Sequence, residues 1–356
     1  MRITFVVAAV DFGGGIRVIA QHAEGLRRKG HEVLVVSPPP YPTGRIAKFR
    51  NTYFPPSEVA VASHFDDTKV SVKFIERYRP VKVSDVPPAD IIIATWWETA
   101  EWIASFPDDR GKKLHFVQDY EIWNGDKERV DACLKLPIEK ITISSWLEHI
   151  LVEHVGTPKP AIVLNGVDTN RFSQPERRMP SPPMLGFVYT SNFRKGSDIA
   201  VAALIKAKEH IPNLRCIAFG HEKPGSNLPL PDFVEYRLLP PQDEIPYIYG
   251  QCSVWLFTSR EEGFGLPILE ALACGTPVVA TSAGAAPDIL AGGGGILSES
   301  FEPEKIASQI ALILRLNNNE WKNLSNESVK ISSGFSNEIS INKMEETLID
   351  ITRKPI

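Results

Sequence analysis

The 356-residue chain has few cysteines and no excess of charge of either sign. Its cysteines are Cys133, Cys216, Cys252 and Cys274, and no two of them have metal-ligand or C-x-x-C spacing. We therefore expect reduced thiols in the protein core. Lys and Arg total 39 against 43 Asp and Glu, a net charge of −4, which argues against a general nucleic-acid binder.

Long hydrophobic runs are also missing. The most apolar stretch near the N-terminus, residues 3–10, is followed by Asp11 and three glycines, and no segment approaches 18 apolar residues. Such a stretch is too short to cross a bilayer and lacks the small-residue cleavage site of a signal peptide. We expect a cytoplasmic protein, either free or attached to the inner face of the membrane.

Metal-binding patterns are absent from the sequence. The eight histidines do not cluster, and His149 and His154 are five residues apart, off the i,i+4 spacing of a zinc pair. No Asp-x-Asp pair exists either. The sequence therefore predicts neither a metal nor a bound cofactor.

What is present is an alternation of strands and helices. Residues 3–10 and 33–36 are apolar runs typical of buried strands, and an amphipathic helix between them ends at Lys29 and Gly30. This strand–helix–strand unit predicts a parallel sheet and an α/β fold. Because one hydrophobic core stops growing at roughly 250–300 residues, the length predicts two domains.

The predicted boundaries follow the alternation. Residues 1–172 form the first domain, 173–183 a linker that holds four prolines, and 184–335 the second domain, with a last helical segment at 336–356. In the second half, strands are expected at 185–190, 214–219, 233–238, 253–258 and 277–281, and helices at 197–209, 243–250, 267–274, 302–315 and 338–352. Residues 38–88 are interrupted by prolines and give no clear pattern.

The most informative segment surrounds a glycine-rich loop between a strand and a helix. Glu262 precedes the loop and Glu270 lies eight residues later in the helix, which begins near Pro267. Backbone N–H groups at such a helix start favour an anion, and two carboxylates can accept from hydroxyl groups. The pattern predicts a ligand that combines phosphate with a sugar or ribose. Either glutamate alone is more often a helix-start or solvated loop residue than a ligand contact.

From Glu262 to Val279 the sequence resembles the signature of retaining glycosyltransferases of family 4, in which seven residues separate two glutamates. Three other parts of the sequence are similar to motifs of that family. They are Leu164 to Phe172, Lys195 to Asp198, and the glycine loop at 13–15 together with Gly30 to Val33. The resemblance implies the GT-B fold, two Rossmann-like doubly wound domains that face a cleft. It also implies that the C-terminal helix packs back on the first domain.

The resemblance implies roles for individual residues. Glu270 would hold the ribose of a nucleotide-sugar donor, Glu262 would face the transferred sugar, and Lys195 would neutralise the diphosphate leaving group. The residues with implied loop contacts to the donor are Gly263, Phe264, Gly265, Leu266, Gly14 and Gly15. A dinucleotide fingerprint is not met at the last two, because Val18 stands where the third glycine belongs.

Three features depart from the family pattern. No Gly-Arg pair stands several residues before Lys195, so Arg194 would take over its phosphate contact. Gln118 and Asp119 replace the His-Asp pair that the family often has on the acceptor or sugar side. Trp96 and Trp97 are unlike the common members, whereas the string from Val117 to Glu121 is similar to transferases of bacterial surface polysaccharides.

We therefore expect a retaining, metal-independent hexosyltransferase that moves a sugar from a nucleotide diphosphate to a glycan, lipid or small-molecule acceptor. Its place would be in bacterial polysaccharide or glycoconjugate synthesis. Two alternatives stay open, a nucleotide-sugar epimerase of the same fold and a non-catalytic subunit that binds sugar nucleotides. An NAD(P) oxidoreductase is disfavoured by the broken fingerprint.

Overall fold

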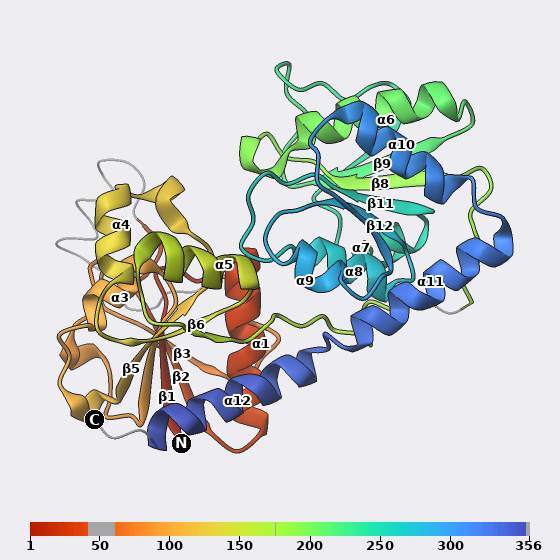
Figure 1. Ribbon diagram of the computed structural model, residues 1–356. Coiled ribbons are helices and arrows are strands. Elements are labelled where there is room, and N and C mark those ends of the chain that lie inside the picture. The colour runs from red at the N-terminus through yellow and green to blue at the C-terminus, as the bar shows by residue number, and fades with distance from the viewer. Residues whose placement is uncertain (42–60, 175, 354–356) are drawn as a thin grey trace. The chain divides into compact units, whose positions relative to one another are not determined.

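The computed structural model describes residues 1–41, 61–174 and 176–353, which divide into two compact units. The first unit comprises Met1–Leu164 together with Glu338–Ile356, and the second comprises Asn165–Asn337. Each unit contains one parallel sheet with helices on both faces (Figure 1). Two α/β units agree with the fold class expected from the strand–helix alternation.

The first unit has a sheet in the order β3-β2-β1-β4-β5-β6-β7, with all neighbouring strands parallel. Its strands are β1 (Arg2–Val6), β2 (Glu32–Ser37), β3 (Ser71–Phe74), β4 (Ile91–Ala94), β5 (Lys112–Val117), β6 (Glu139–Thr142) and β7 (Ala161–Ile162). Its helices are α1 (Gly14–Arg28), α3 (Trp97–Ile103), α4 (Lys127–Leu134), α5 (Ser145–His149), which continues as a π-helical turn (Ile150–Val155), and α12 (Asn337–Arg353).

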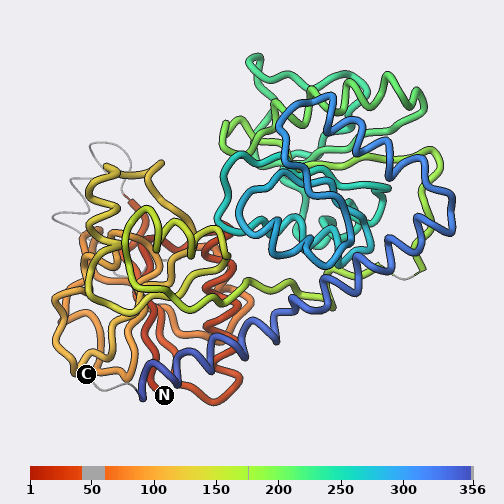
Figure 2. Tube along the Cα trace, viewed as in Figure 1, coloured from red at the N-terminus to blue at the C-terminus, as the bar shows by residue number. Residues whose placement is uncertain are grey.

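The C-terminal helix α12 belongs to the first unit. It lies beside α1 in the chain trace (Figure 2). Ile341 of α12 fills the space beside Gly25 of α1, so that a side chain at position 25 would collide with it. Lys112 Nζ, at the start of β5, donates to the Ile351 carbonyl at a distance of 3.0 Å. These contacts fix the last helix on the first sheet, as the resemblance implied.

An ion-pair cluster reinforces this docking. The Glu345 carboxylate accepts from Lys29 Nζ at 2.7 Å and lies 2.8 Å from His31 Nε2. Lys29, and then His31, lower the pKa of Glu345 below its usual value. A depressed carboxyl pKa in the folded state means that the stabilisation exists above the unfolded pKa of 4.5 and is lost as the pH falls through the folded value.

We expect Glu345→Gln to lower the free energy of unfolding at pH 7 by about 0.5–1 kcal/mol, the range of partly exposed ion pairs. Below the lowered pKa the difference from the wild type should vanish, because both side chains are then neutral. Urea unfolding at the two pH values measures this. Glu346→Gln, next to it and 68% exposed, is the control and should have little effect at either pH. An equal loss at both pH values would contradict the ion-pair origin.

The second unit has a sheet in the order β10-β9-β8-β11-β12-β13, again entirely parallel. Its strands are β8 (Met184–Val188), β9 (Arg215–Gly220), β10 (Val234–Leu238), β11 (Val254–Phe257), β12 (Val278–Thr281) and β13 (Gly295–Ser298). Its helices are α6 (Ser197–His210), α7 (Ile245–Gly250), α8 (Leu266–Ala273), α9 (Ala286–Leu290), α10 (Pro303–Leu314) and α11 (Asn318–Ser333). Helices α6 and α10 cover one face, and α7, α8, α9 and α11 cover the other (Figure 1).

Every strand and helix predicted after residue 184 is present, with ends within two residues of the prediction. Three elements were not predicted: α9, β13 and α11. Residues 173, 174 and 176–183 also differ from the expected linker, because they lie inside the second unit. There Arg177 donates to the Cys252 carbonyl at 2.6 Å and its guanidinium lies 5.3 Å from the Trp321 ring. The first unit ends at Leu164, before the predicted boundary at residue 172.

Candidate functional site

The candidate site of the second unit lies at the carboxyl ends of β8 and β11. These strands are neighbours, and the strand order reverses between them, since β9 lies on one side of β8 and β11 on the other. In open α/β sheets, ligands bind in the crevice at such a reversal. The loop after β8 contains Lys195, and the loop after β11 contains Glu262.

Hydrogen bonds to backbone carbonyls join these two loops. The Arg260 amide donates to the Arg194 carbonyl at 2.7 Å, and Thr258 Oγ1 donates to the Gly196 carbonyl at 2.8 Å. Gly196 has a φ of +64°, and a Cβ there would overlap the Thr258 carbonyl oxygen. Glycine is therefore required at position 196 for both backbone conformation and space. Lys195 is thus held on a fixed turn against the neighbouring loop.

The two cations of the first loop face the two glutamates of the second. Lys195 Nζ lies 2.7 Å and 2.6 Å from the two carboxylate oxygens of Glu262. Arg194 Nε donates to Glu261 at 2.9 Å. The structure therefore brings together Lys195 and Glu262, which the resemblance assigned to different parts of the donor. Glu261 was not singled out from the sequence, because a solvated loop glutamate has no distinguishing pattern.

The glycine-rich loop forms the start of α8. Gly265 caps the helix with a φ of +103°, Leu266 is the first helical residue and Pro267 the second. Phe264 is 3% exposed, and its carbonyl accepts from the Ala285 amide at 2.8 Å. Gly263 is buried as well. Burial and this hydrogen bond hold the loop in the core, which orients its amides.

Glu270 lies on α8 and is 5% exposed. One carboxylate oxygen accepts from the Tyr249 hydroxyl of α7 at 2.7 Å. The role of Tyr249 was missed, because nothing in the spacing of residues 245–250 connects them with position 270. The contact helps to fix the direction of this buried carboxylate, and burial of a charged group requires such hydrogen bonds.

A cavity of about 480 Å³ opens beside the β8 loop, at the carboxyl ends of β8 and β9. Glu222 lines this cavity together with Thr190 and Ser191. Its carboxylate accepts from the Ser191 amide at 2.6 Å and from the hydroxyls of Thr190 and Ser191. The Ser191 amide, followed by these hydroxyls, lowers the pKa of Glu222 to about 2. The carboxylate stays ionised and shapes the loop that precedes Lys195.

In the first unit, the loop after β1 meets the end of β5. Gln118 packs over Gly15, where a Cβ would lie 3.5 Å from the side-chain nitrogen of Gln118. Gln118 Oε1 is buried without a hydrogen-bond partner. Gly14 is exposed at the start of α1, with open space where a side chain would be. The sequence-predicted residues Gly14, Gly15 and Gln118 therefore share one edge of the first sheet.

Asp119 lies beside two tryptophan rings at the same edge of the first sheet. Its carboxylate accepts from Trp123 Nε1 at 3.1 Å, and Trp123 is 51% exposed. The Trp123 ring stands edge-on to Trp96, with centroids 5.6 Å apart. Below them Glu121 is buried, accepts from the Trp97 amide at 2.9 Å, and has its pKa raised well above the usual value by that burial. Trp97 is part of the core, whereas Trp123 is accessible to a ligand.

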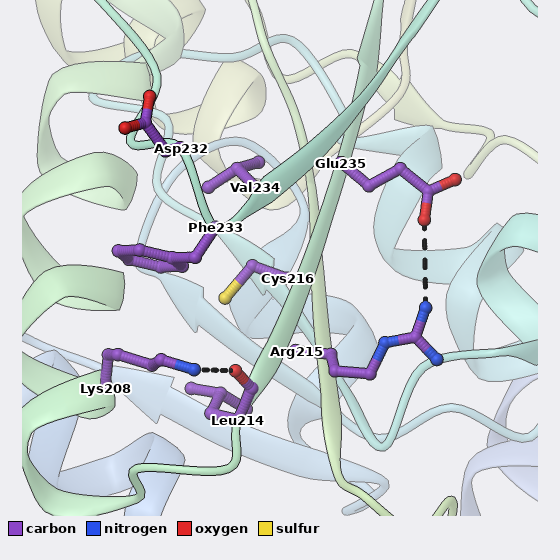
Figure 3. Close-up of a pocket in the computed structure, with 8 residues that line it drawn as sticks. All are labelled: Lys208, Leu214, Arg215, Cys216, Asp232, Phe233, Val234 and Glu235. Atoms are coloured by element: carbon purple, nitrogen blue, oxygen red, sulfur yellow. Dashed lines mark hydrogen bonds and ion pairs between the residues drawn. The ribbon is translucent and has the colours of Figure 1, made fainter.

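Another hollow in the second unit does not resemble a site. It lies at the amino ends of β9 and β10 (Figure 3), and its cations are already engaged. Lys208 donates to the Leu214 carbonyl at 2.6 Å, and Arg215 lies 3.8 Å from Glu235. Burial raises the pKa of the Cys216 thiol there to about 12, which leaves it unreactive. All four cysteines are free and buried.

No group of three or more His, Cys, Asp or Glu side chains in residues 1–41, 61–174 and 176–353 could hold a metal ion. None of the helices in these ranges combines the length and the apolar character that a bilayer crossing requires.

The second unit is similar to a known protein family. Residues 168–330 match the family model described as "Glycosyl transferases group 1". The matched range includes Lys195, Glu262 and Glu270. The second unit is therefore similar to glycosyl transferases group 1 over residues 168–330, and the resemblance is confirmed at this level.

Two curated relatives are similar over part of the chain. O-antigen chain mannosyltransferase B of Escherichia coli is 30% identical over 92 residues, which cover 26% of this chain and 23% of that protein. D-inositol 3-phosphate glycosyltransferase of Segniliparus rotundus is 29% identical over 188 residues, 47% of this chain and 42% of that protein. The chain spans less than half the length of these relatives.

A solved structure matches both units. The crystal structure of Anabaena HepE in complex with UDP-glucose covers 98% of this chain and 100% of its own, with a TM-score of 0.75 and 20% sequence identity. Likeness at this identity shows the fold. The expected GT-B fold of two Rossmann-like domains is thereby confirmed.

Proposed function

We propose that the chain is a retaining glycosyltransferase of family 4 that transfers a sugar from a nucleotide diphosphate donor to a glycan, glycolipid or small-molecule acceptor. The observation that carries the proposal is the pairing of Lys195 with Glu262 at the strand-order reversal of a unit similar to glycosyl transferases group 1. The names of the two relatives support a role in bacterial polysaccharide or glycoconjugate synthesis. We place the reaction in the cytoplasm or at the inner face of the membrane.

The second unit would bind the donor. Glu270, held by Tyr249, would accept from the ribose hydroxyls, and Glu262 from hydroxyls of the transferred sugar. Lys195, Arg194 and the amides of residues 263–266 would face the diphosphate. As the glycosidic bond breaks, charge develops on the departing diphosphate, and fixed cations and N–H donors stabilise it. For retention we favour front-face attack assisted by the leaving phosphate, so no carboxylate nucleophile is assigned.

The first unit would bind the acceptor. Trp123 offers an exposed apolar ring, and the Asp119 carboxylate beside it can accept from hydroxyl groups. The side-chain carbonyl oxygen of Gln118 has no hydrogen-bond partner, and a hydroxyl of an acceptor or sugar could donate to it. A ring face next to hydroxyl acceptors suits a sugar, and this edge also contains the Gly14–Gly15 loop.

A panel of nucleotide diphosphate sugars and their nucleoside diphosphates tests the donor site by thermal shift. A ligand that binds only the folded state raises apparent stability by RT ln(1 + [L]/Kd). Product analysis with the stabilising donor then separates the alternatives. Transfer to a glycan supports the glycosyltransferase, an isomerised sugar nucleotide without acceptor supports the epimerase, and tight binding without turnover supports a binding subunit.

We expect the transfer to need no divalent metal. Lys195, Arg194 and the loop amides can supply the positive potential that a metal would otherwise provide. Activity measured with excess chelator should stay within about twofold of the untreated enzyme, a change of only ~0.4 kcal/mol in the barrier. Loss of activity that magnesium or manganese restores would overturn the metal-free site.

A further inference from the structure

The Lys195–Glu262 ion pair poses a chemical problem for the proposed donor site. Lys195 Nζ is within 2.7 Å of both carboxylate oxygens, and Ser259 Oγ donates to one of them at 3.3 Å. Only 36% of the Lys195 side chain and 17% of the Glu262 side chain are exposed. A diphosphate that recruits Lys195 therefore competes for the cation with a largely enclosed carboxylate.

The consequence depends on what else the ligand brings. A carboxylate that loses its cation inside a protein costs free energy unless other donors replace it. The hydroxyl groups of a sugar are such donors, and a sugar nucleotide carries them next to the diphosphate. A nucleoside diphosphate has no sugar on its terminal phosphate, and that phosphate carries an additional negative charge. Glu262 would then face an anion without its cation, and the single 3.3 Å contact from Ser259 Oγ would be the hydroxyl donor left to it.

We propose that Glu262 competes with the diphosphate for Lys195 and thereby makes the site select the sugar nucleotide over the sugar-free nucleoside diphosphate. The proposal rests on the proposed function, since it takes the donor diphosphate to lie at Lys195. It gives Glu262 a task beyond contact with the sugar. Once the sugar has been transferred, the pair re-forms and expels the product, so the same contact limits product inhibition.

The neighbouring glutamate provides a matched comparison. Glu261 is the adjacent residue of the same loop and pairs with Arg194 at 2.9 Å, but its side chain is 58% exposed. Water can solvate Glu261 when Arg194 turns to a phosphate, so its loss should affect both ligands alike. Selectivity should therefore depend on the enclosed pair and not on the exposed one.

Calorimetric titration of the full chain tests this, with UDP and UDP-glucose, and GDP and GDP-mannose, as the ligand pairs. For the pair that the wild type binds, Glu262→Gln should tighten the nucleoside diphosphate about tenfold and weaken or leave unchanged the sugar nucleotide. The ratio of the two dissociation constants should thus change by tenfold or more. Glu261→Gln should leave this ratio within about twofold. Glutamine matches glutamate in shape, and the thermal midpoint of each variant verifies folding.

The same substitution in a Lys195→Ala background tests the exchange itself. In that background there is no lysine for Glu262 and the diphosphate to compete for. Glu262→Gln should then change the ratio of the two dissociation constants much less than tenfold. An unchanged ratio in the single variant, or the full change in the Lys195→Ala background, overturns the proposal. If the wild type binds none of the nucleotide ligands, ADP, CDP and dTDP with their sugar derivatives included, the proposed donor site fails instead. The two failures are therefore distinguishable.

Discussion

Lys195→Ala should lower kcat by on the order of 10²-fold, comparable to the loss of one oxyanion-hole donor. Charge on the diphosphate grows as the glycosidic bond breaks, so a lysine beside it gains interaction energy in the transition state. Only that differential part accelerates the chemical step. Donor affinity should change less, because Lys195 leaves one anion, Glu262, to bind another. Steady-state kinetics together with donor titration measure both effects.

Lys206→Ala is the control for this variant. Lys206 is on α6 of the same unit, its side chain is 40% exposed, and its nearest carboxylate is 3.7 Å away. Surface changes of this kind usually stay within ±0.5 kcal/mol in stability and should leave kcat unchanged. If Lys195→Ala also kept kcat within about twofold of the wild type, Lys195 would lie outside the reacting site.

The strands and helices that sequence predicted well are those whose apolar residues recur at the period of the element. Helix α6 buries Ile199, Ala203 and Ala207 at spacings of four, and its ends were predicted within one residue. Helix α11 has 16 residues and was missed. Its buried positions include Ser325 and Ser328, whose hydroxyls donate to the carbonyls of Gly275 and Gly294. A serine face of this kind has no hydrophobic period to detect.

The site was predictable to a different degree. The glycine loop, Glu262, Glu270 and Lys195 were predicted as site residues because their types and spacing form a motif. Their partners were not, since the contacts Tyr249–Glu270 and Arg194–Glu261 join segments 21 and 67 residues apart. The Lys195–Glu262 pair joins two positions that were both predicted, but as groups aimed at a ligand. The Tyr249–Glu270 contact depends on the packing of α7 on α8, and the Arg194–Glu261 contact depends on the meeting of the loops after β8 and β11. Local sequence patterns do not encode either arrangement.

The ribose assignment of Glu270 leads to the second large effect. Glu270→Gln should weaken binding of the nucleotide sugar by roughly 1.5–3 kcal/mol, the range for a hydrogen bond to a charged group. The amide oxygen of glutamine can still accept from the Tyr249 hydroxyl, so the internal contact at 2.7 Å is preserved. What is lost is the negative charge that ribose hydroxyls would meet. Because a nucleoside diphosphate has the same ribose, its affinity should fall by a similar amount.

Tyr249→Phe separates this loss from a structural one. The variant keeps the Glu270 carboxylate and removes only the hydroxyl that orients it, so donor affinity should fall less than in Glu270→Gln. The phenylalanine variant should instead lose about 0.5–1.5 kcal/mol in free energy of unfolding, the net contribution of one hydrogen bond. Calorimetric titration and urea unfolding of both variants decide the matter. Unchanged affinity of Glu270→Gln for both the nucleoside diphosphate and its sugar derivative would show that Glu270 supports α8 and does not bind ribose.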